Sequence, residues 1–237
     1  MSIADVKALT FDVFGTVVDW RASIIRQGEE WGRAKNITMD WTVFTDAWHG
    51  TYRPSMNRVN DGEDPWTNVN AIYRRELDPL FDSFGVTGLT DEEKDRFNYA
   101  WCKLDPWPDS VAGLARLKKK YLLSTLSNGD IGMLTRMAKF GGLPWDCVLS
   151  SQLFRRYKPS PEVYLGAIEL LGLRPHEFMM TAAHNYDLRA ARSHGMKTGF
   201  ICRPTEYGPN QKTDLEAEED WDVTASSMEE FADKMGA

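Results

Sequence analysis

Residues 6–16 read VKALTFDVFGT, and this stretch decides the fold class. The apolar run of residues 6–11 predicts a buried strand that leads directly to the carboxylate of Asp12. Gly15 lets the chain turn immediately afterwards, so the carboxylate is presented at the rim of a sheet, where open α/β folds carry their chemistry. Asp12 is therefore a candidate catalytic group, and the alternative role for it is a helix N-cap.

Short apolar runs recur along the chain, and a helical pattern follows each of them. We predict strands at residues 6–11, 121–126, 147–150, 178–182, 198–202 and 221–224, and helices at 109–120, 130–140, 160–172, 185–195 and 227–235. Alternation of helices with nearly continuous apolar strands is typical of a parallel sheet covered on both faces. The predicted fold class is therefore α/β, with a doubly wound, Rossmann-like parallel sheet.

The stretch from residue 19 to residue 105 does not follow this alternation. It predicts only helices, at residues 20–35, 40–57, 66–83 and 90–103. We predict an all-helical cap of residues 19–105, inserted into a Rossmann-like catalytic core of residues 1–18 and 106–237. The alternative is that these helices simply pack on a face of the sheet.

Composition and charge exclude several classes of function. A net charge of −7 argues against nucleic acid or an anionic membrane as the main partner. No apolar run approaches the roughly 18 residues of a transmembrane helix. The three cysteines lie far apart without metal-ligand spacing, and the N-terminal segment does not resemble a signal peptide. We therefore expect a cytoplasmic protein. Residues 204–220 predict a surface loop whose acidic run is solvated and carries no chemistry.

Polar side chains follow four of the predicted strands. Asp12 follows the first strand, Ser127 and Asn128 end the second, Lys158 comes after the third, and Asp187 comes after the fourth. In a parallel sheet the carboxyl ends of the strands meet at one edge. We therefore expect two carboxylates, a hydroxyl–amide pair and an ammonium to converge there, although helix caps and a solvated lysine are the ordinary alternatives.

The residue at position 14 narrows the chemistry. Phosphate-transferring enzymes of this design carry a second acid two residues after the first, and this chain has Phe14 there. The chain keeps a candidate nucleophile in Asp12 but lacks the group that would protonate an oxygen leaving group. The sequence therefore favours a reaction whose leaving group needs no proton.

Four motifs, in this order and over nearly the whole chain, resemble those of the haloacid dehalogenase superfamily. They are Phe11-Asp12-Val13-Phe14-Gly15-Thr16, Leu126-Ser127-Asn128-Gly129, Tyr157-Lys158-Pro159 and His184-Asn185-Tyr186-Asp187. Within the superfamily, the phenylalanine in the first motif indicates the (S)-2-haloacid dehalogenase branch. The resemblance implies an enzyme that hydrolyses short-chain (S)-2-haloalkanoic acids, including haloacetates such as fluoroacetate, to (R)-2-hydroxy acids.

The resemblance also implies roles for the catalytic residues. Asp12 is the nucleophile that attacks C2, expels halide and forms an ester that water then hydrolyses. Thr16 holds Asp12 by a hydrogen bond, and Lys158 keeps it ionised. Asp187 is the general base for the hydrolytic water or orients it, and Asn185 belongs to the same catalytic motif.

For the substrate, the resemblance implies contacts with Val13 and Phe14. Ser127 and Asn128 bind the substrate carboxylate together with backbone N–H groups, and Asn128 also contributes to the halide site. Because His184 stands where the phosphatases place an acidic ligand and imidazole is a poor ligand for Mg²⁺, we expect no metal. No cofactor is implied.

Two histidines depart from the commonest pattern of this branch. His184 replaces the asparagine of a Ser-Ser-Asn segment, and we hypothesise that it positions or activates water beside Asp187; a structural histidine is the alternative. His49 stands where the family has a halide-binding arginine, with Arg53 one helical turn further on as the alternative. A shorter residue implies a smaller halide pocket, and an imidazolium there would donate hydrogen bonds to departing fluoride.

Two other functions stay open. One is a Mg²⁺-dependent small-molecule phosphatase of the same fold, which Phe14 and His184 disfavour. The other is a non-catalytic binding protein on this scaffold, which the joint presence of Asp12, Lys158 and Asp187 disfavours. The expected partner is a small halogenated carboxylic acid. Members of this branch are often homodimers, although this chain carries no dimer signature of its own.

Overall fold

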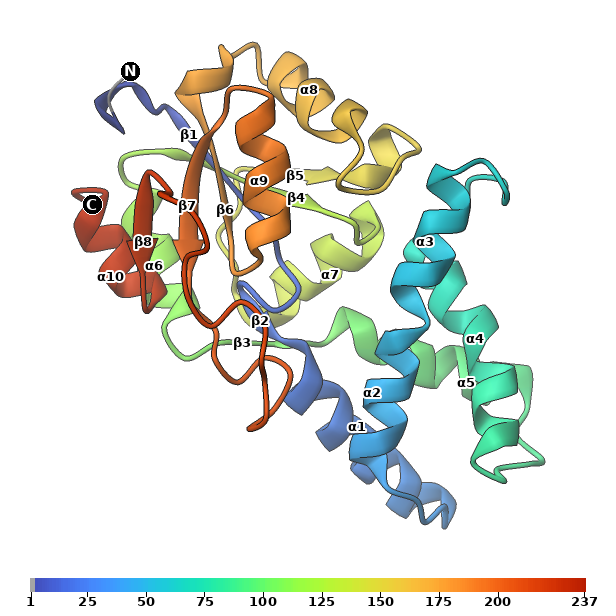
Figure 1. Ribbon diagram of the computed structural model, residues 1–237. Coiled ribbons are helices and arrows are strands. Elements are labelled where there is room, and N and C mark those ends of the chain that lie inside the picture. Colours follow the sequence, from blue (N-terminus) through green and yellow to red (C-terminus); the bar gives the residue numbers. More distant parts are fainter. Residues whose placement is uncertain (1–2) are drawn as a thin grey trace.

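The computed structural model describes residues 3–237, and its centre is a six-stranded sheet in which all strands run parallel (Figure 1). The strands follow the order β5-β4-β1-β6-β7-β8. They are β1 (Ala8–Phe11), β4 (Leu122–Ser127), β5 (Cys147–Ser150), β6 (Phe178–Ala182), β7 (Lys197–Ile201) and β8 (Val223–Ala225). The predicted doubly wound α/β class is confirmed.

The central position of β1 determines where the chemistry can lie. Phe11 at its end pairs with Thr125 of β4 on one side and with Thr181 of β6 on the other. The carboxyl ends of β1, β4 and β6 therefore lie side by side. Any side chain that directly follows one of these strands is brought to the same edge.

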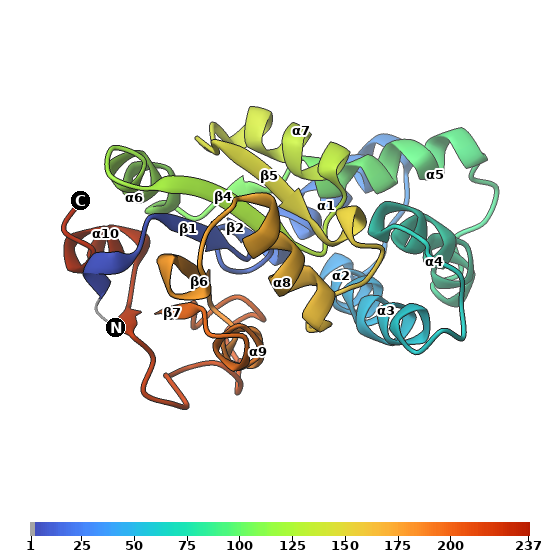
Figure 2. The ribbon, with the colours of Figure 1, turned by 90° about the horizontal axis from the view of Figure 1, so that it is seen from above.

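Helices cover both faces of the sheet, as Figure 2 shows for α6 and α7 on one side and for α8 and α9 on the other. These helices and the last one are α6 (Ser110–Leu117), α7 (Ile131–Gly141), α8 (Pro161–Leu170), α9 (Asn185–Ser193) and α10 (Met228–Lys234). Leu114, Met133 and Phe231 belong to one hydrophobic cluster, and Val163 and Leu188 belong to a second. The two clusters explain why the strands are apolar on both faces.

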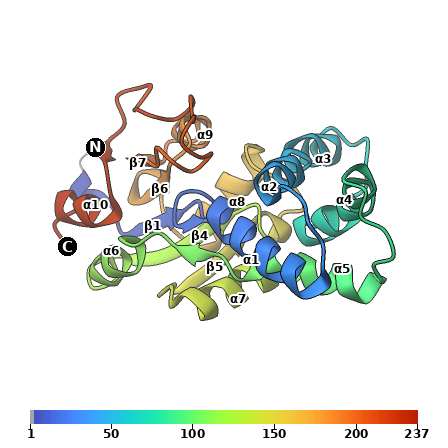
Figure 3. The ribbon, with the colours of Figure 1, turned by 90° about the horizontal axis from the view of Figure 1, so that it is seen from below.

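The remaining helices gather beyond the sheet edge (Figures 1 and 3). They are α1 (Trp20–Lys35), α2 (Trp41–Gly50), α3 (Tyr52–Asn60), α4 (Val69–Ser83), α5 (Asp91–Asn98) and the 3₁₀ turn η2 (Tyr99–Cys102). Buried aromatic side chains fill their interior: Trp48 Nε1, for example, donates to the backbone oxygen of Tyr73 at 3.0 Å. Most of the aromatic residues in this stretch therefore form core.

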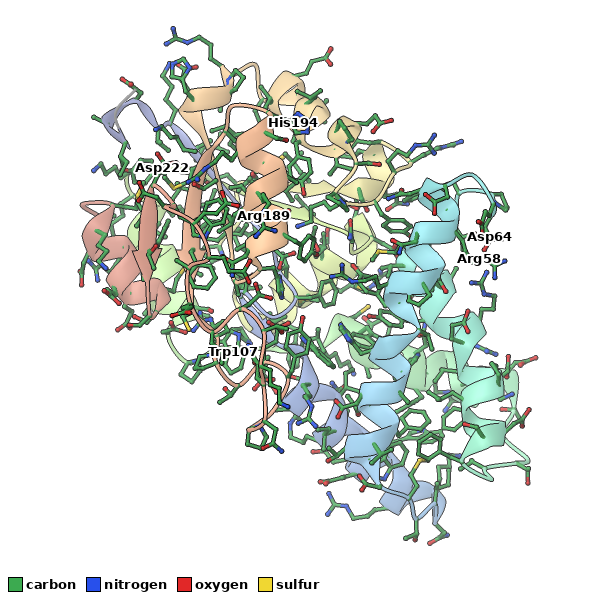
Figure 4. All side chains as sticks on the ribbon, in the orientation of Figure 1. Arg58, Asp64, Trp107, Arg189, His194 and Asp222 are labelled. Carbon is green, nitrogen blue, oxygen red and sulfur yellow. The ribbon has the colours of Figure 1, made fainter. Side chains whose placement is uncertain are left out.

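A short antiparallel ribbon connects these helices to the sheet. Its strands are β2 (Val18–Asp19) and β3 (Asp105–Pro106). Trp107, labelled beside the ribbon in Figure 4, donates from Nε1 to the backbone oxygen of Gly15 at 2.8 Å. The chain therefore leaves the sheet and returns to it at neighbouring points. We propose that residues 19–105 are a separate cap and that residues 1–18 and 106–237 are the catalytic core.

The prediction of a single cap helix at residues 40–57 is wrong, and the difference affects the shape of the site. Residues 40–57 form two helices, α2 and α3, with a break at Thr51. The Thr51 hydroxyl donates to the backbone oxygen of Trp48 at 2.7 Å, and Pro54 lies in the first turn of α3, where proline needs no N–H partner. The break gives the ends of both helices access to one pocket. The predicted helix at residues 90–103 also ends early, because η2 replaces its last turn.

Candidate active site

Asp12 lies at the end of β1 and is held from several sides. Its backbone N–H donates to the backbone oxygen of Thr181, so the parallel hydrogen bonding between β1 and β6 extends to Asp12. The Thr16 hydroxyl donates to Asp12 Oδ2 at 2.9 Å and accepts a bond from the Ala183 N–H. Gly15 has a φ of +80°, the left-handed conformation that glycine adopts without strain. The sequence around Asp12 therefore builds a rigid turn that aims one carboxylate at the sheet edge.

Lys158 supplies the positive charge beside Asp12. Its Nζ donates to Asp12 Oδ1 at 3.0 Å and also to Asp187 Oδ2, and the side chain is buried. Burial alone would lower the pKa of Lys158, but the two carboxylates outweigh it and raise the pKa above its ordinary value. The ammonium is therefore charged when it contacts Asp12.

The pKa of Asp12 reflects the same balance. Burial raises it, whereas the charges and hydrogen bonds of Lys158 and His184 lower it, and the result lies well below the ordinary value for a carboxyl group. Asp12 is therefore an ionised carboxylate, poorly solvated and fixed in orientation. Those are the properties of an activated nucleophile.

His184 joins Asp12 to a carboxylate from a distant part of the chain. Its Nδ1 lies 3.2 Å from Asp12 Oδ2, and its Nε2 lies 3.0 Å from Glu206 Oε2. Burial lowers the pKa of the imidazole, but Glu206 and Asp12 raise it well above its ordinary value. Both ring nitrogens of His184 therefore contact carboxylate groups rather than backbone, and this arrangement favours the imidazolium form.

Glu206 and Tyr207 are site residues that sequence reasoning missed. Between Ile201 and Val223 the chain forms neither helix nor strand, so the predicted loop is confirmed, but this loop sends Glu206 into the site with 2% exposure. The Tyr207 hydroxyl lies 3.4 Å from His184 Nε2. The acidic run predicted to be solvated begins after Glu206, and its residues Glu216, Glu218, Glu219 and Asp220 are exposed. Glu206 and Tyr207 both lie in the irregular loop after β7, and no motif in the sequence marks them as site residues.

Asn128 reaches the pocket, whereas two other predicted substrate contacts do not line it. The amide oxygen of Asn128 accepts a bond from the Lys158 N–H at 2.8 Å. Ser127 is fully buried, and its hydroxyl accepts a bond from the Gly129 N–H. Val13 is buried in the hydrophobic core. Ser127 and Val13 therefore support the loops around Asp12 rather than face the pocket.

Asp187 and Asn185 lie behind the site. Asp187 is 0% exposed, and its carboxylate is occupied by Lys158 and by the Tyr164 hydroxyl at 2.6 Å. Burial raises the pKa of Asp187 more than the adjacent ammonium of Lys158 lowers it. The Asn185 side chain binds Asp214 at 2.9 Å and Trp221 at 2.8 Å, so it anchors the loop after β7. Neither side chain lines the pocket.

The pocket has a volume of about 260 Å³ and lies between the core and the cap. Its lining residues come from both: Asp12, Phe14, Asn128, His184, Tyr186, Glu206 and Tyr207 from the core, and His49, Gly50, Tyr52 and Arg53 from the two helix ends beside the break at Thr51. Arg53 lies over the Tyr186 ring, with 4.7 Å from its guanidinium carbon to the ring centre. A small acid fits a space of this size.

His49 stacks on Trp20 with 3.9 Å between ring centres. Burial and the nearby charge of His184 lower its pKa to about 4. This environment disfavours the imidazolium form of His49 near neutral pH. The ring is neutral there and offers a single N–H donor.

The described residues, 3–237, show neither a metal-binding cluster nor a membrane-spanning helix. Within this range no group of three or more His, Cys, Asp and Glu side chains is arranged to hold a metal ion. In the same part of the chain, no helix combines the length and the apolar character needed to cross a membrane. The expectation of a metal-independent, cofactor-free site stays a prediction.

The comparisons with known proteins agree with this geometry. A family model described as haloacid dehalogenase-like hydrolase matches residues 6–195. The chain belongs to this family. "(S)-2-haloacid dehalogenase 1" of Pseudomonas sp. (strain CBS-3) is 30% identical to this hydrolase over 209 residues, which cover 85% of this chain and 88% of that protein.

Two solved structures resemble this haloacid dehalogenase-like hydrolase over nearly its whole length. The crystal structure of an L-2-haloacid dehalogenase matches with a TM-score of 0.95 and 45% identity, and covers 98% of this chain and 99% of that one. The crystal structure of a defluorinating L-2-haloacid dehalogenase matches with a TM-score of 0.96 and 40% identity, and covers 98% of this chain and 96% of that one. The resemblance that the four motifs carry is confirmed.

Proposed function

We propose that this hydrolase cleaves the carbon–halogen bond of short-chain (S)-2-haloalkanoic acids and releases (R)-2-hydroxy acids through an ester on Asp12, without a metal. One observation carries the proposal: Asp12 is an ionised, positioned carboxylate in a small pocket, and Phe14 stands where a proton donor for an oxygen leaving group would be needed. The similar (S)-2-haloacid dehalogenases support the same chemistry.

In the first step, Asp12 attacks C2 and displaces halide. Lys158 and Thr16 hold the carboxylate in one orientation, which lowers the entropic part of the barrier. Displacement requires the leaving group to lie opposite the attacking oxygen, so C2 is inverted. Because Asp12 belongs to the core, the halide then departs toward the cap residues His49 and Tyr52.

The first test is halide release from chloroacetate, fluoroacetate and each enantiomer of 2-chloropropionate, with EDTA present. We expect release that survives chelation and favours the (S) enantiomer. An inert protein that hydrolyses phosphate esters once Mg²⁺ is added would establish the phosphatase alternative instead. A protein without either activity, and without a covalent intermediate, would support the binding-protein alternative.

Arg53 is the cation that we assign to the substrate carboxylate. Among the ion pairs described for residues 3–237, none involves Arg53, although it lines the pocket. Arg53→Ala should lower kcat/KM for chloroacetate by about 10- to 100-fold, mainly through KM, because a charge-assisted hydrogen bond contributes about 1.5–3 kcal/mol. Steady-state kinetics of halide release measure this effect.

The matched control is Arg58→Ala on the same helix. Arg58 pairs with Asp64 at 2.8 Å, and Figure 4 shows both labels at the outer end of α3, away from the sheet. We expect this control to keep the wild-type KM. An unchanged KM in Arg53→Ala as well would contradict the assignment.

His49 is the residue that we assign to the departing halide. His49→Phe should lower kcat by about 10- to 100-fold, and by more for fluoroacetate than for chloroacetate, because fluoride depends most on hydrogen-bond donors as it leaves. His49→Gln retains an N–H donor and should keep more of the activity. Comparison of the two variants on both substrates measures the effect, and equal losses on both substrates would contradict it. The similar defluorinating enzyme supports fluoroacetate as a substrate to try.

A further inference from the structure

Glu206 is built into the site although it comes from an irregular loop. Its carboxylate contacts His184 Nε2 through both oxygens, at 3.1 and 3.0 Å, and also accepts a bond from Trp20 Nε1 at 3.0 Å. A Cβ atom on Gly15 would lie 2.0 Å from Glu206 Oε1, so the turn after Asp12 is shaped to admit this carboxylate. A buried charge with these partners is positioned, not incidental.

The site needs a proton acceptor for the second half of the reaction. Water that hydrolyses an ester on Asp12 must lose a proton near that carboxyl group. Asp187 is poorly placed for this task, because it is fully buried and both of its oxygens already have partners in Lys158 and Tyr164. Lys158 Nζ also contacts Asp12, at 3.0 Å, but it does not line the pocket and is held between two carboxylates. His184 lines the pocket and lies 3.2 Å from Asp12, so it is the titratable group that both contacts Asp12 and faces the space from which water would attack.

We propose that His184 takes the proton from the hydrolytic water, and that Glu206 is the positioning residue that orients the imidazole and stabilises its charged form. This inference rests on the proposed function, because it concerns the breakdown of the ester on Asp12. The general base is then His184 rather than Asp187, and Glu206, from the loop that follows β7, supports it.

One proton leaves the site in each catalytic cycle. Asp12 forms its bond to C2, and halide leaves with the electron pair. Esterification removes one of the two negative charges beside His184, so the Nδ1 proton passes to solvent; this is the one proton that the overall hydrolysis releases. Water then adds to the Asp12 carbonyl carbon and gives a proton to Nδ1, while Nε2–H stays bonded to Glu206.

The ester then breaks and the resting state returns. The bond between the carbonyl carbon and the hydroxy-acid oxygen cleaves, and the proton on Nδ1 moves to that oxygen. The second proton of the former water remains on the Asp12 carboxyl group. It passes to Nδ1, which restores the ionised carboxylate of Asp12 and an imidazolium held between Asp12 and Glu206.

The test separates the two half-reactions. With chloroacetate, we expect Glu206→Gln to release a first equivalent of halide at a rate within about threefold of wild type, and then to turn over about 100-fold or more slowly. Mass spectrometry of the peptide that contains Asp12 should show the carboxymethyl ester accumulating. His184→Asn should also trap the ester, and the double variant should be no slower than the slower single one, because the two residues act as a unit.

Two controls separate a specific effect of Glu206→Gln from a folding defect or a general effect of the loop. Glutamine has the shape of glutamate and keeps an acceptor for Trp20, and thermal melting checks that Glu206→Gln folds. Glu216→Gln, an exposed position in the same loop, should behave as wild type. If Glu206→Gln slows both half-reactions equally, or turns over without trapped ester, the inference is overturned while the proposed function stands. If the wild-type enzyme releases no halide, the proposed function itself fails.

Discussion

Asp12→Asn should abolish halide release from chloroacetate, with a loss of at least about 10⁴-fold in kcat/KM. The amide is a far weaker nucleophile than the ionised carboxylate that Lys158, Thr16 and His184 hold in place. No neighbouring acid should take over, because residue 14 is phenylalanine, Asp187 is enclosed by Lys158 and Tyr164, and Glu206 is held by His184 and Trp20. The measurement is halide release at high enzyme concentration, together with mass spectrometry for any covalent adduct.

The loss of halide release in Asp12→Asn should not result from unfolding of the protein. In Asp12→Asn, Lys158 still pairs with Asp187, so the buried ammonium keeps a counterion and the thermal midpoint should stay close to that of wild type. A folded Asp12→Asn protein that still releases halide at more than about one-hundredth of the wild-type rate would overturn the role of Asp12 as nucleophile.

Lys158→Met should be the most destabilising of the substitutions considered. It leaves Asp187 buried without a cation and Asp12 with His184 as its remaining charged partner, and loss of one partner from a buried ion pair costs about 3–5 kcal/mol. Activity should fall by about 10³-fold or more, because Asp12 is no longer held ionised. Urea unfolding at pH 7 and halide release measure the two effects.

The destabilisation by Lys158→Met should grow with pH. In wild type the folded-state pKa of Asp12 lies below its unfolded value, so this group stabilises the fold at every pH above about 4. Without the ammonium, the pKa values of both carboxyl groups rise in the folded state, and their ionisation then opposes folding as the pH increases. We therefore expect a larger loss of unfolding free energy at pH 8 than at pH 5.

Two variants check this interpretation. Lys158→Met combined with Asp187→Asn should recover part of the lost stability, because it removes the buried charge that has lost its cation. Lys234→Met, at an exposed lysine that pairs with Glu230 one helical turn away, should change the unfolding free energy by less than about 1 kcal/mol. Equal losses at pH 5 and pH 8 for Lys158→Met would contradict the electrostatic explanation.

Strands, and the polar residues placed directly after them, could be predicted because their signals are local. A continuous apolar run such as the one before Asp12 must be buried on both faces, and a parallel sheet then places the ends of its strands at one edge. Asp12, Thr16, Lys158 and His184 meet there for that reason. The break at Thr51 was missed because a helix-compatible segment continues on both sides of it.

The sequence by itself therefore determined the α/β class, the family and the central contact between Asp12 and Lys158. Only the tertiary structure decided which neighbours reach the pocket: it encloses Asp187 behind Lys158, buries Ser127 beside Gly129, and brings Glu206 back to Trp20 and His184. The physical reason is the range of the interactions. Side chains that follow a strand are positioned by local backbone pairing, whereas Glu206 is positioned by contacts with Trp20, 186 residues away along the chain.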